Sequence, residues 1–203
     1  ISYYLMIPPL SGNIHREHMP DRLHRVSSST WLDEIRDHFR KYSSVPIIDP
    51  TNALLQAKKH APIYFKTDIH WNPYGAYFGY EELIERIRKD RPTVGAPWPL
   101  SDFTFEPEVN DRADLANMLG LNDVLTRVEP VCRTERPRSA TFRSNPELPH
   151  KDHFLDVPRT FTTGDTNKLN LLMFHDSFGL YMMPLISEHF NHSTFVWTGA
   201  YLP

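Results

Sequence analysis

The sequence predicts a three-layer α/β domain in which helices cover both faces of a parallel sheet. Short apolar runs alternate along the chain with segments whose apolar residues recur every three or four positions. Strands that alternate with helices are typical of βαβ units, which build parallel sheets with helices on their faces. A chain of 203 residues, 40% of them hydrophobic, is long enough for one such domain with a sizeable core.

The expected strands are short apolar runs, at residues 2–7, 45–48, 63–65, 102–109, 171–174 and 194–198. The expected helices show helical spacing of apolar residues, at residues 30–42, 51–60, 73–89, 111–119 and 180–190. In the first of these helices, Trp31, Ile35 and Phe39 form an apolar stripe that we expect to pack on the sheet. Ser28 or Ser29 is expected to cap that helix.

Asn72 followed by Pro73 is a strong signal for the start of the third helix. An Asn side chain accepts a hydrogen bond from a free N–H of the first turn, and Pro suits the first helical position. We expect the buried face of this helix to consist of Ala76, Tyr80, Leu83, Ile84 and Ile87.

A loop-rich insertion is expected at residues 122–167 within a single domain that spans residues 1–203. This insertion is rich in Pro, Arg, Thr and Ser and predicts exposed hairpin-like strands near residues 127–132, 139–142 and 156–162. The chain begins at Ile1 without Met and opens directly on a strand, so we interpret it as a fragment or processed product of a longer protein.

Composition excludes several classes of function. The net charge is −3 and there is no block of basic residues, so neither nucleic acid nor an anionic membrane surface is an expected partner. Cys132 is the single cysteine, which excludes an internal disulfide and a cysteine-based metal site. The histidines outside the segments discussed below lack the spacing of a zinc site, and glycine-rich phosphate loops are absent. We therefore expect no metal and no cofactor.

Ser177 lies at the turn between an expected strand, residues 171–174, and an expected helix. Open parallel sheets keep their active sites at the carboxyl ends of strands. The start of the following helix supplies free N–H groups that can stabilise an oxyanion. A serine at a helix start is also a common N-cap, so position alone leaves both interpretations open. Asp176 is expected to brace the turn by accepting backbone N–H bonds.

Asp68 and His70 lie in the loop before the helix that begins at Pro73. A serine hydroxyl needs an imidazole to take its proton, and the imidazole needs a carboxylate to fix its tautomer. With one residue between them, Asp68 and His70 can bond across a tight turn and direct the other ring nitrogen toward Ser177. From the spacing alone, a capping or surface role for this pair is equally open.

Three segments carry a family resemblance. Lys66–Ala76, with the sequence Lys-Thr-Asp-Ile-His-Trp-Asn-Pro-Tyr-Gly-Ala, resembles the T-D-x-H-W-N…G-A signature of the alginate O-acetyltransferase family of SGNH-hydrolase-like proteins. Asp111–Leu119 is similar to the G-D-L-A-x-M-L block of that family, and Tyr4–Pro9 resembles its first strand and proline turn. The segments follow one another in the family's order over most of the chain.

The serine segment completes the resemblance and also departs from it. Leu172–Gly179 resembles the family's G-D-S-F block, and Leu185 with His189-Phe190 resembles the L…H-F helix that follows. His175 stands where the family has glycine, and Gly179 stands where serine is usual. We expect His175, beside the nucleophile, to affect turn geometry and substrate preference.

The resemblance implies a three-layer SGNH-hydrolase-like fold, of the flavodoxin-like kind, with a triad of Asp68, His70 and Ser177. It implies transfer of an acetyl group onto hydroxyls of an extracytoplasmic polysaccharide in the bacterial periplasm, with the acetyl donor supplied through a membrane acyltransferase. Two alternatives stay open. The same triad with water as acceptor gives a carbohydrate acetylesterase, and an inert site gives a polysaccharide-binding module.

Residues around the expected triad are candidates for binding the sugar. Trp71 can stack on a sugar ring, although a tryptophan next to a helix start is more often part of the core. Tyr74 and Lys66 can donate hydrogen bonds to a sugar hydroxyl or carboxylate, although solvated surface is the commoner place for such residues. His175 is a fourth candidate because of its position next to the serine turn.

Overall fold

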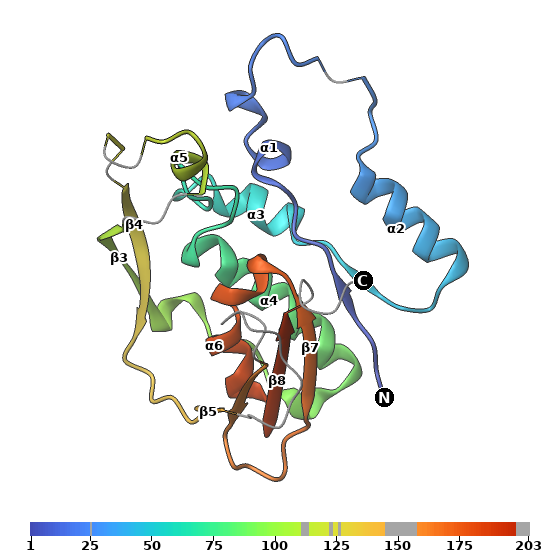
Figure 1. Ribbon diagram of the computed structural model, residues 1–203. Coiled ribbons are helices and arrows are strands. Elements are labelled where there is room, and N and C mark those ends of the chain that lie inside the picture. Colours follow the sequence, from blue (N-terminus) through green and yellow to red (C-terminus); the bar gives the residue numbers. More distant parts are fainter. Residues whose placement is uncertain (25, 111–113, 122–123, 126, 145–157, 198–203) are drawn as a thin grey trace.

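The computed structural model describes residues 1–203 except 25, 111–113, 122–123, 126, 145–157 and 198–203 (Figure 1). The strands of this described part lie in three separate sheets. Two of the sheets are pairs, one parallel and one antiparallel, formed by β1 (Leu5–Met6) with β2 (Ile47–Ile48) and by β3 (Phe103–Asn110) with β4 (Arg127–Thr134). The third has the strand order β5 (Thr141–Ser144), β6 (Arg159–Thr162), β8 (His192–Trp197) and β7 (Leu171–His175).

The four-stranded sheet is mixed. Strand β7 runs parallel to β8, whereas β6 runs antiparallel to both β5 and β8. The expected single parallel sheet with helices on both faces is therefore not confirmed, because the sheets are small and their pairing is mixed. Strand β7 is also not fully buried as expected: Leu172 is 60% exposed and Phe174 is 62% exposed. Both residues point away from the core on an edge strand, which gives the alternating pattern of a half-covered sheet.

The longest helix, α4 (Pro73–Asp90), forms the centre of the core. It begins where the sequence predicts, because the Asn72 side chain accepts a hydrogen bond from the Gly75 N–H at 2.9 Å. All five residues expected on its buried face are buried. Gly75 permits the backbone at Ile63 to approach the helix closely, since a Cβ at position 75 would lie 2.1 Å from the carbonyl oxygen of Ile63. The segment that precedes the helix is thereby held directly against its first turn.

The expected third strand, residues 63–65, is replaced by an isolated antiparallel bridge between Tyr64 and Trp71. The Phe65 N–H donates to the carbonyl oxygen of His70 at 3.1 Å, and the Asn72 N–H donates to that of Ile63 at 3.0 Å. The chain thus turns back on itself, and residues 66–70 form a loop closed by main-chain hydrogen bonds immediately before α4.

The remaining helices are short. They are α1 (Ser11–Ile14), η1 (Arg16–His18), α3 (Thr51–Ala57), η2 (Pro92–Val94), η3 (Leu100–Asp102) and α5 (Asp114–Met118). The expected helix at residues 180–190 is wrong as a single element, because it is divided into η4 (Ser177–Tyr181), α6 (Met183–Ile186) and η5 (Ser187–His189). Pro184 lies in the first turn of α6 and has no N–H with which to continue the turn before it. Within the described residues, no helix combines the length and the apolarity needed to cross a membrane.

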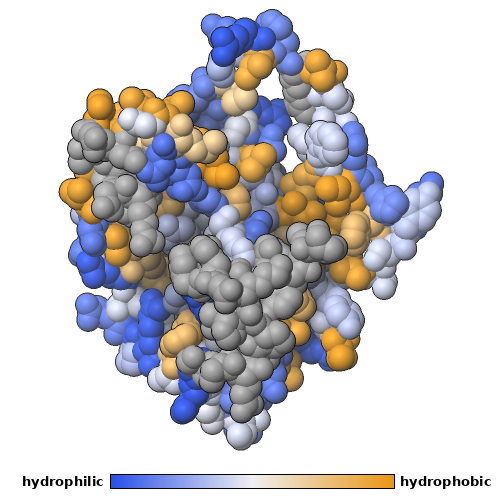
Figure 2. Space-filling view, in the orientation of Figure 1, coloured by the Kyte–Doolittle hydropathy of each residue, from blue (hydrophilic) through white to orange (hydrophobic). Residues whose placement is uncertain are grey.

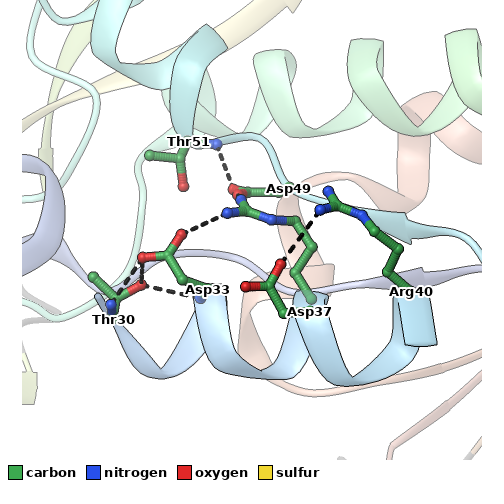
Figure 3. Close-up of polar contacts among 7 residues, drawn as sticks. Thr30, Asp33, Asp37, Arg40, Asp49 and Thr51 are labelled. Carbon is green, nitrogen blue, oxygen red and sulfur yellow. Dashed lines mark hydrogen bonds and ion pairs between the residues drawn. The ribbon is translucent and has the colours of Figure 1, made fainter. Parts of the chain in front are cut away.

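Helix α2 (Trp31–Tyr42) is twelve residues long, yet none of its residues is buried. Its cap is Thr30 rather than Ser28 or Ser29, and Thr30 forms a reciprocal capping box with Asp33 (Figure 3). The expected packing of its apolar stripe is wrong, since Trp31 is 85% exposed. Helix α2 stands to one side of the domain in Figure 1, and Figure 2 shows an apolar area between it and the rest of the molecule.

The polar side of α2 is the side that connects it to its neighbours. The Arg36 guanidinium bonds Asp33 at 2.7 Å within the helix and Asp49 at 3.1 Å in the loop before α3. Asp49 in turn accepts a hydrogen bond from the N–H of Thr51, the first residue of α3 (Figure 3). These contacts are partly exposed, so each contributes little to the free energy of folding.

Candidate active site

Two loops that are far apart in sequence meet above the first turn of α4. One is the closed loop that carries Asp68 and His70, and the other is the turn from β7 into η4, whose first residue is Ser177. The indole Nε1–H of Trp71 donates to the carbonyl oxygen of Phe178 at 2.9 Å. Because Trp71 and Phe178 are neighbours of His70 and Ser177, this buried bond fixes the distance between the two loops.

Asp68, His70 and Ser177 form a continuous hydrogen-bonded chain. The Oδ1 atom of Asp68 lies 2.6 Å from Nδ1 of His70 and also accepts the His70 backbone N–H at 3.0 Å. The Nε2 atom of His70 lies 2.5 Å from the hydroxyl oxygen of Ser177. The structure thus brings together the three residues expected to form the triad. In this arrangement the carboxylate fixes the ring so that Nε2 can accept the serine proton.

The electrostatics suit an imidazole that takes up a proton. The hydrogen bond to Asp68 raises the pKa of His70 above its ordinary value, against the lowering effect of partial burial, and the nearby carboxylates of Asp114 and Asp176 raise it further. Burial acts to raise the pKa of Asp68, but the hydrogen bonds from His70 outweigh it and keep that pKa below its ordinary value. Asp68 therefore stays ionised beside His70, and the imidazolium that forms during proton transfer is stabilised.

The turn that presents Ser177 is braced by Asp176, as the sequence predicts. Its Oδ1 accepts the Phe178 N–H at 2.9 Å, and its carbonyl oxygen accepts the Gly179 N–H at 3.1 Å. The carbonyl oxygen also lies 2.7 Å from Nδ1 of His175. The backbone of the turn is thus bonded on both sides of the serine, which holds the hydroxyl toward His70.

Two residues of this turn, His175 and Gly179, depart from the family pattern, and their sizes are matched. A Cβ on Gly179 would lie 2.8 Å from Cβ of His175 and 3.0 Å from its Cγ, which is closer than real Cβ contacts. A larger residue at position 179 is therefore excluded by the histidine at 175. The ring at position 175 therefore requires a residue without a Cβ at position 179.

Comparisons with known proteins show the family to which this chain belongs. Residues 1–160 match the family described as the SGNH hydrolase-like domain of the acetyltransferase AlgX. The chain belongs to this family. Over 156 residues it is 25% identical to the probable alginate O-acetylase AlgJ of Pseudomonas aeruginosa, a match that covers 73% of this chain and 37% of AlgJ. The chain therefore spans little more than a third of the length of that relative.

Solved structures show the same fold. PatB1 of Bacillus cereus, in a structure with a sulfonyl adduct, gives a TM-score of 0.69 at 17% identity, over 100% of this chain and 74% of PatB1. The O-acetyltransferase domain of Pseudomonas putida AlgJ gives a TM-score of 0.58 at 18% identity, over 96% of this chain and 62% of that one. The SGNH-hydrolase-like fold expected from the sequence is confirmed at this level.

Two of the expected sugar-binding residues in this AlgX-family chain are buried. Trp71 is 0% exposed, lies against Phe178 with ring centroids 5.4 Å apart, and packs over Gly79 of α4. It cannot stack on a sugar, because the large indole fills the space between α4 and the serine turn. His175 is also buried, next to Trp197, and burial lowers its pKa. His175 also lines a pocket of about 200 Å³ together with Asp176 and Gly179, so its expected contact with substrate stays a prediction.

The other two expected binding residues lie nearer the surface. Lys66 is exposed in the closed loop before α4. Tyr74 is half-buried in the first turn of α4, where its ring packs edge-on against Phe78 and Phe105 at centroid distances of 5.3 and 4.9 Å. Tyr74 therefore contributes mainly to packing against β3, and Lys66 keeps the exposure that a ligand contact requires.

A pocket of about 440 Å³ lies next to the end of η4, and its walls include none of the three triad residues. Its walls come from the η4–α6 segment, the segment around Phe65 and the β3–β4 pair, and include Leu180, Tyr181, Val131 and Arg138. The rings of Phe65 and Tyr181 meet edge to face with centroids 5.5 Å apart. Tyr181 was not predicted from the sequence as a site residue; it is the last residue of η4, four positions after Ser177, and lines this pocket.

Asp114 is the second residue missed from the sequence. Its Oδ2 atom lies 3.7 Å from Nδ1 of His70, so His70 has two carboxylates near the same nitrogen. The signal for it was present, because Asp114 belongs to the segment that resembles the G-D-L-A-x-M-L block. Nothing in the spacing, however, indicates that this segment folds back onto His70.

Two groups in the described part hold three potential metal ligands within 4.8 Å of one another, Asp68–His70–Asp114 and His15–Glu17–His18. Both are explained without a metal. In the first, Nδ1 of His70 is bonded to Asp68. In the second, the ammonium of Lys58 lies 3.1 Å from both carboxylate oxygens of Glu17 and neutralises the charge that a cation would need.

Proposed function

We propose that this chain transfers an acetyl group onto a hydroxyl of an extracytoplasmic polysaccharide through an acetyl-enzyme at Ser177. The observation that supports this most strongly is the hydrogen-bonded chain of Asp68, His70 and Ser177, at 2.6 and 2.5 Å, in a member of an acetyltransferase family. The relative AlgJ carries alginate O-acetylase in its name, which favours a polysaccharide as acceptor.

The first half-reaction forms the acetyl-enzyme. The Ser177 oxygen attacks the carbonyl carbon of the acetyl donor while Nε2 of His70 takes the serine proton, and the carbonyl π electrons move onto its oxygen. The N–H of Ser177, the first residue of η4, is the donor that we propose for that oxyanion. The tetrahedral intermediate collapses, the bond to the leaving group breaks, and the leaving group takes the proton from the His70 imidazolium.

The second half-reaction runs the same steps toward the acceptor. A sugar hydroxyl loses its proton to His70 as its oxygen attacks the acetyl-serine, and collapse returns the proton to Ser177 and releases the acetylated sugar. We propose that the acceptor lies in the pocket beside η4, where the rings of Tyr181 and Phe65 can support a sugar and exclude water. We further propose a periplasmic location and a membrane acyltransferase as the source of the acetyl group.

The test measures the product on the acceptor. The purified protein is incubated with an activated acetyl ester and an oligosaccharide, and the oligosaccharide is examined by mass spectrometry. Acetylated sugar with the natural chain and with the control Ser101→Ala, but not with Ser177→Ala, supports the transferase. Release of free acetate that no acceptor changes would instead indicate an acetylesterase with the same triad. Glycan binding without an acetyl-enzyme would indicate a binding module.

The pH dependence tests the role of His70 independently. His70 must be neutral to accept the serine proton, so kcat/KM for the activated ester should fall as the pH drops through its pKa in the free enzyme. Because Asp68 raises that pKa, the midpoint of this fall in kcat/KM, the acid limb of the pH profile, should lie above the ordinary histidine value of about 6.5. A rate that stays constant well below that pH would contradict His70 as the base.

A further inference from the structure

Asp114 stands at the start of α5 and approaches the triad from an element that carries none of its three residues. Its Oδ2 atom is 3.7 Å from Nδ1 of His70, on the side of the ring already bonded to Asp68. The Asp114 side chain is about half exposed, whereas those of Asp68 and His70 are nearly buried. Asp114 therefore lies at the solvent side of the Asp68–His70 pair.

The main chain of α5 is bonded to the same loop. The Asp114 backbone N–H forms a hydrogen bond with the Asp68 carboxylate, and the Leu115 N–H donates to the carbonyl oxygen of Thr67 at 3.0 Å. Two consecutive N–H groups of α5 thus hold two consecutive residues of the catalytic loop. The Asp68 carboxylate is satisfied from both sides, by His70 within its own loop and by Asp114 across from it.

Within the described part of the chain, three negative charges act on His70. They are the carboxylate of Asp68 from its own loop, that of Asp114 from α5, and that of Asp176 from the turn before η4. Attack by Ser177 converts His70 from neutral to positive, so each of these charges favours the state that follows proton transfer. Asp114 and Asp68 lie within 4 Å of the same ring nitrogen, and of the two, Asp114 is the one on a separate element.

We propose that Asp114 is a positioning residue for the transfer reaction. Its main chain holds the Asp68 carboxylate against His70, and its side chain supplies a second negative charge that stabilises the imidazolium. This inference rests on the function proposed above. It assigns a role to the G-D-L-A-like segment: α5 completes the support of the triad from outside the two loops that carry it.

The test separates the side-chain charge from the main-chain contact. Asp114→Asn keeps the backbone N–H and the shape of the side chain but removes the charge, and Asp114→Glu keeps the charge. Asp37→Asn is the matched control, because Asp37 lies on the exposed helix α2 and pairs only weakly with Arg40, at 3.4 Å with both side chains exposed. Each variant is assayed for acetate release from an activated ester over a range of pH.

Asp114→Asn should lower the plateau of kcat/KM by about two- to fivefold, the size expected for one partly exposed charge. Its acid limb should at the same time move to lower pH, because His70 loses a carboxylate that raises its pKa. A residue that only supported the fold would not produce this combination. Asp114→Glu should return the acid limb close to its original pH, and Asp37→Asn should leave plateau and limb unchanged.

A second measurement decides the inference even if no acetyl donor is turned over. The His70 imidazole is titrated by NMR in the natural chain and in Asp114→Asn. We expect His70 to titrate at lower pH in the variant. Identical titration curves would overturn the role of Asp114, as would an unchanged plateau and limb in an active enzyme. An inactive natural chain with a shifted His70 titration would instead overturn the proposed function and leave the inference about Asp114 standing.

Discussion

Trp71 and Trp31 each lie next to the cap of a helix, but their surroundings are opposite. Trp71 precedes the cap Asn72, is 0% exposed, and bonds the serine turn through its indole nitrogen. Trp31 follows the cap Thr30 and is 85% exposed on a helix with no buried residue. Both helices start with a well-formed cap. The difference teaches that a cap fixes where a helix begins, whereas packing against other elements decides whether it can position a site.

The packed region carries all of the proposed catalytic machinery. The Asp68–His70 loop is closed by main-chain bonds, the serine turn is braced by Asp176, and Trp71 joins them over α4. Helix α2 is held mainly by partly exposed polar contacts such as the pair between Arg36 and Asp49. Substitutions in the first region should therefore change stability and activity together, and substitutions in α2 should change neither by much.

The largest effect is expected from Trp71→Ala. Removing a fully buried indole leaves a cavity between α4 and the serine turn and deletes the bond to Phe178, so the free energy of unfolding should fall by about 3–5 kcal/mol. Trp31→Ala makes the same chemical change at an exposed position and should stay within about 0.5 kcal/mol. Urea unfolding of both variants measures the two losses of unfolding free energy. Equal losses would show that the two regions do not differ as described.

The next effect tests the exchange of side chains in the serine turn. Gly179→Ser places a Cβ against His175 and should cost about 1–3 kcal/mol by overpacking. In His175→Gly the clashing ring is absent, so the double variant should be more stable than the two single effects added together. A double-mutant cycle in urea gives this interaction directly. Strict additivity would mean that the two positions do not compensate each other.

The smallest effect is expected at the cap of α2. Thr30→Ala removes the side-chain half of the capping box and should weaken the helix by about 1 kcal/mol. Because α2 buries no residue, the change should appear as faster hydrogen exchange of α2 amides, with the exchange of α4 amides and the rate of acetate release unchanged. Loss of activity in this variant would reveal a connection between α2 and the site that its contacts do not suggest.

Local signals in the sequence predicted several of the features that depend on neighbouring residues. The dipeptide Asn72-Pro73 located the start of α4, helical spacing identified its buried face, and the spacing of Asp68 and His70 predicted their hydrogen bond. Asp176 was expected to brace the turn, and it does. In each of these features the interacting residues lie within a few positions of one another, so a local stretch of sequence is enough to predict the contact.

Several features that depend on distant partners were not predicted, although the family resemblance did lead us to expect that His70 and Ser177 meet. Strand β7 proved to be an edge strand with Leu172 and Phe174 exposed, which an apolar run alone cannot distinguish from a central strand. The hydrogen bond from Trp71 to Phe178 joins distant segments, and the place of Asp114 depends on how α5 folds back onto His70. No local pattern indicates these contacts, because tertiary packing decides them.

The central claim is that Ser177, activated by His70, carries the acetyl group. It is tested most directly by peptide mass spectrometry of the protein after brief exposure to an activated acetyl ester, with His70→Ala treated in parallel. We predict acetyl on the peptide that contains Ser177, and a loss of most of this labelling in His70→Ala because the serine then lacks its base. Acetyl on other residues with Ser177 unmodified, or equal labelling of Ser177 without His70, would contradict the account.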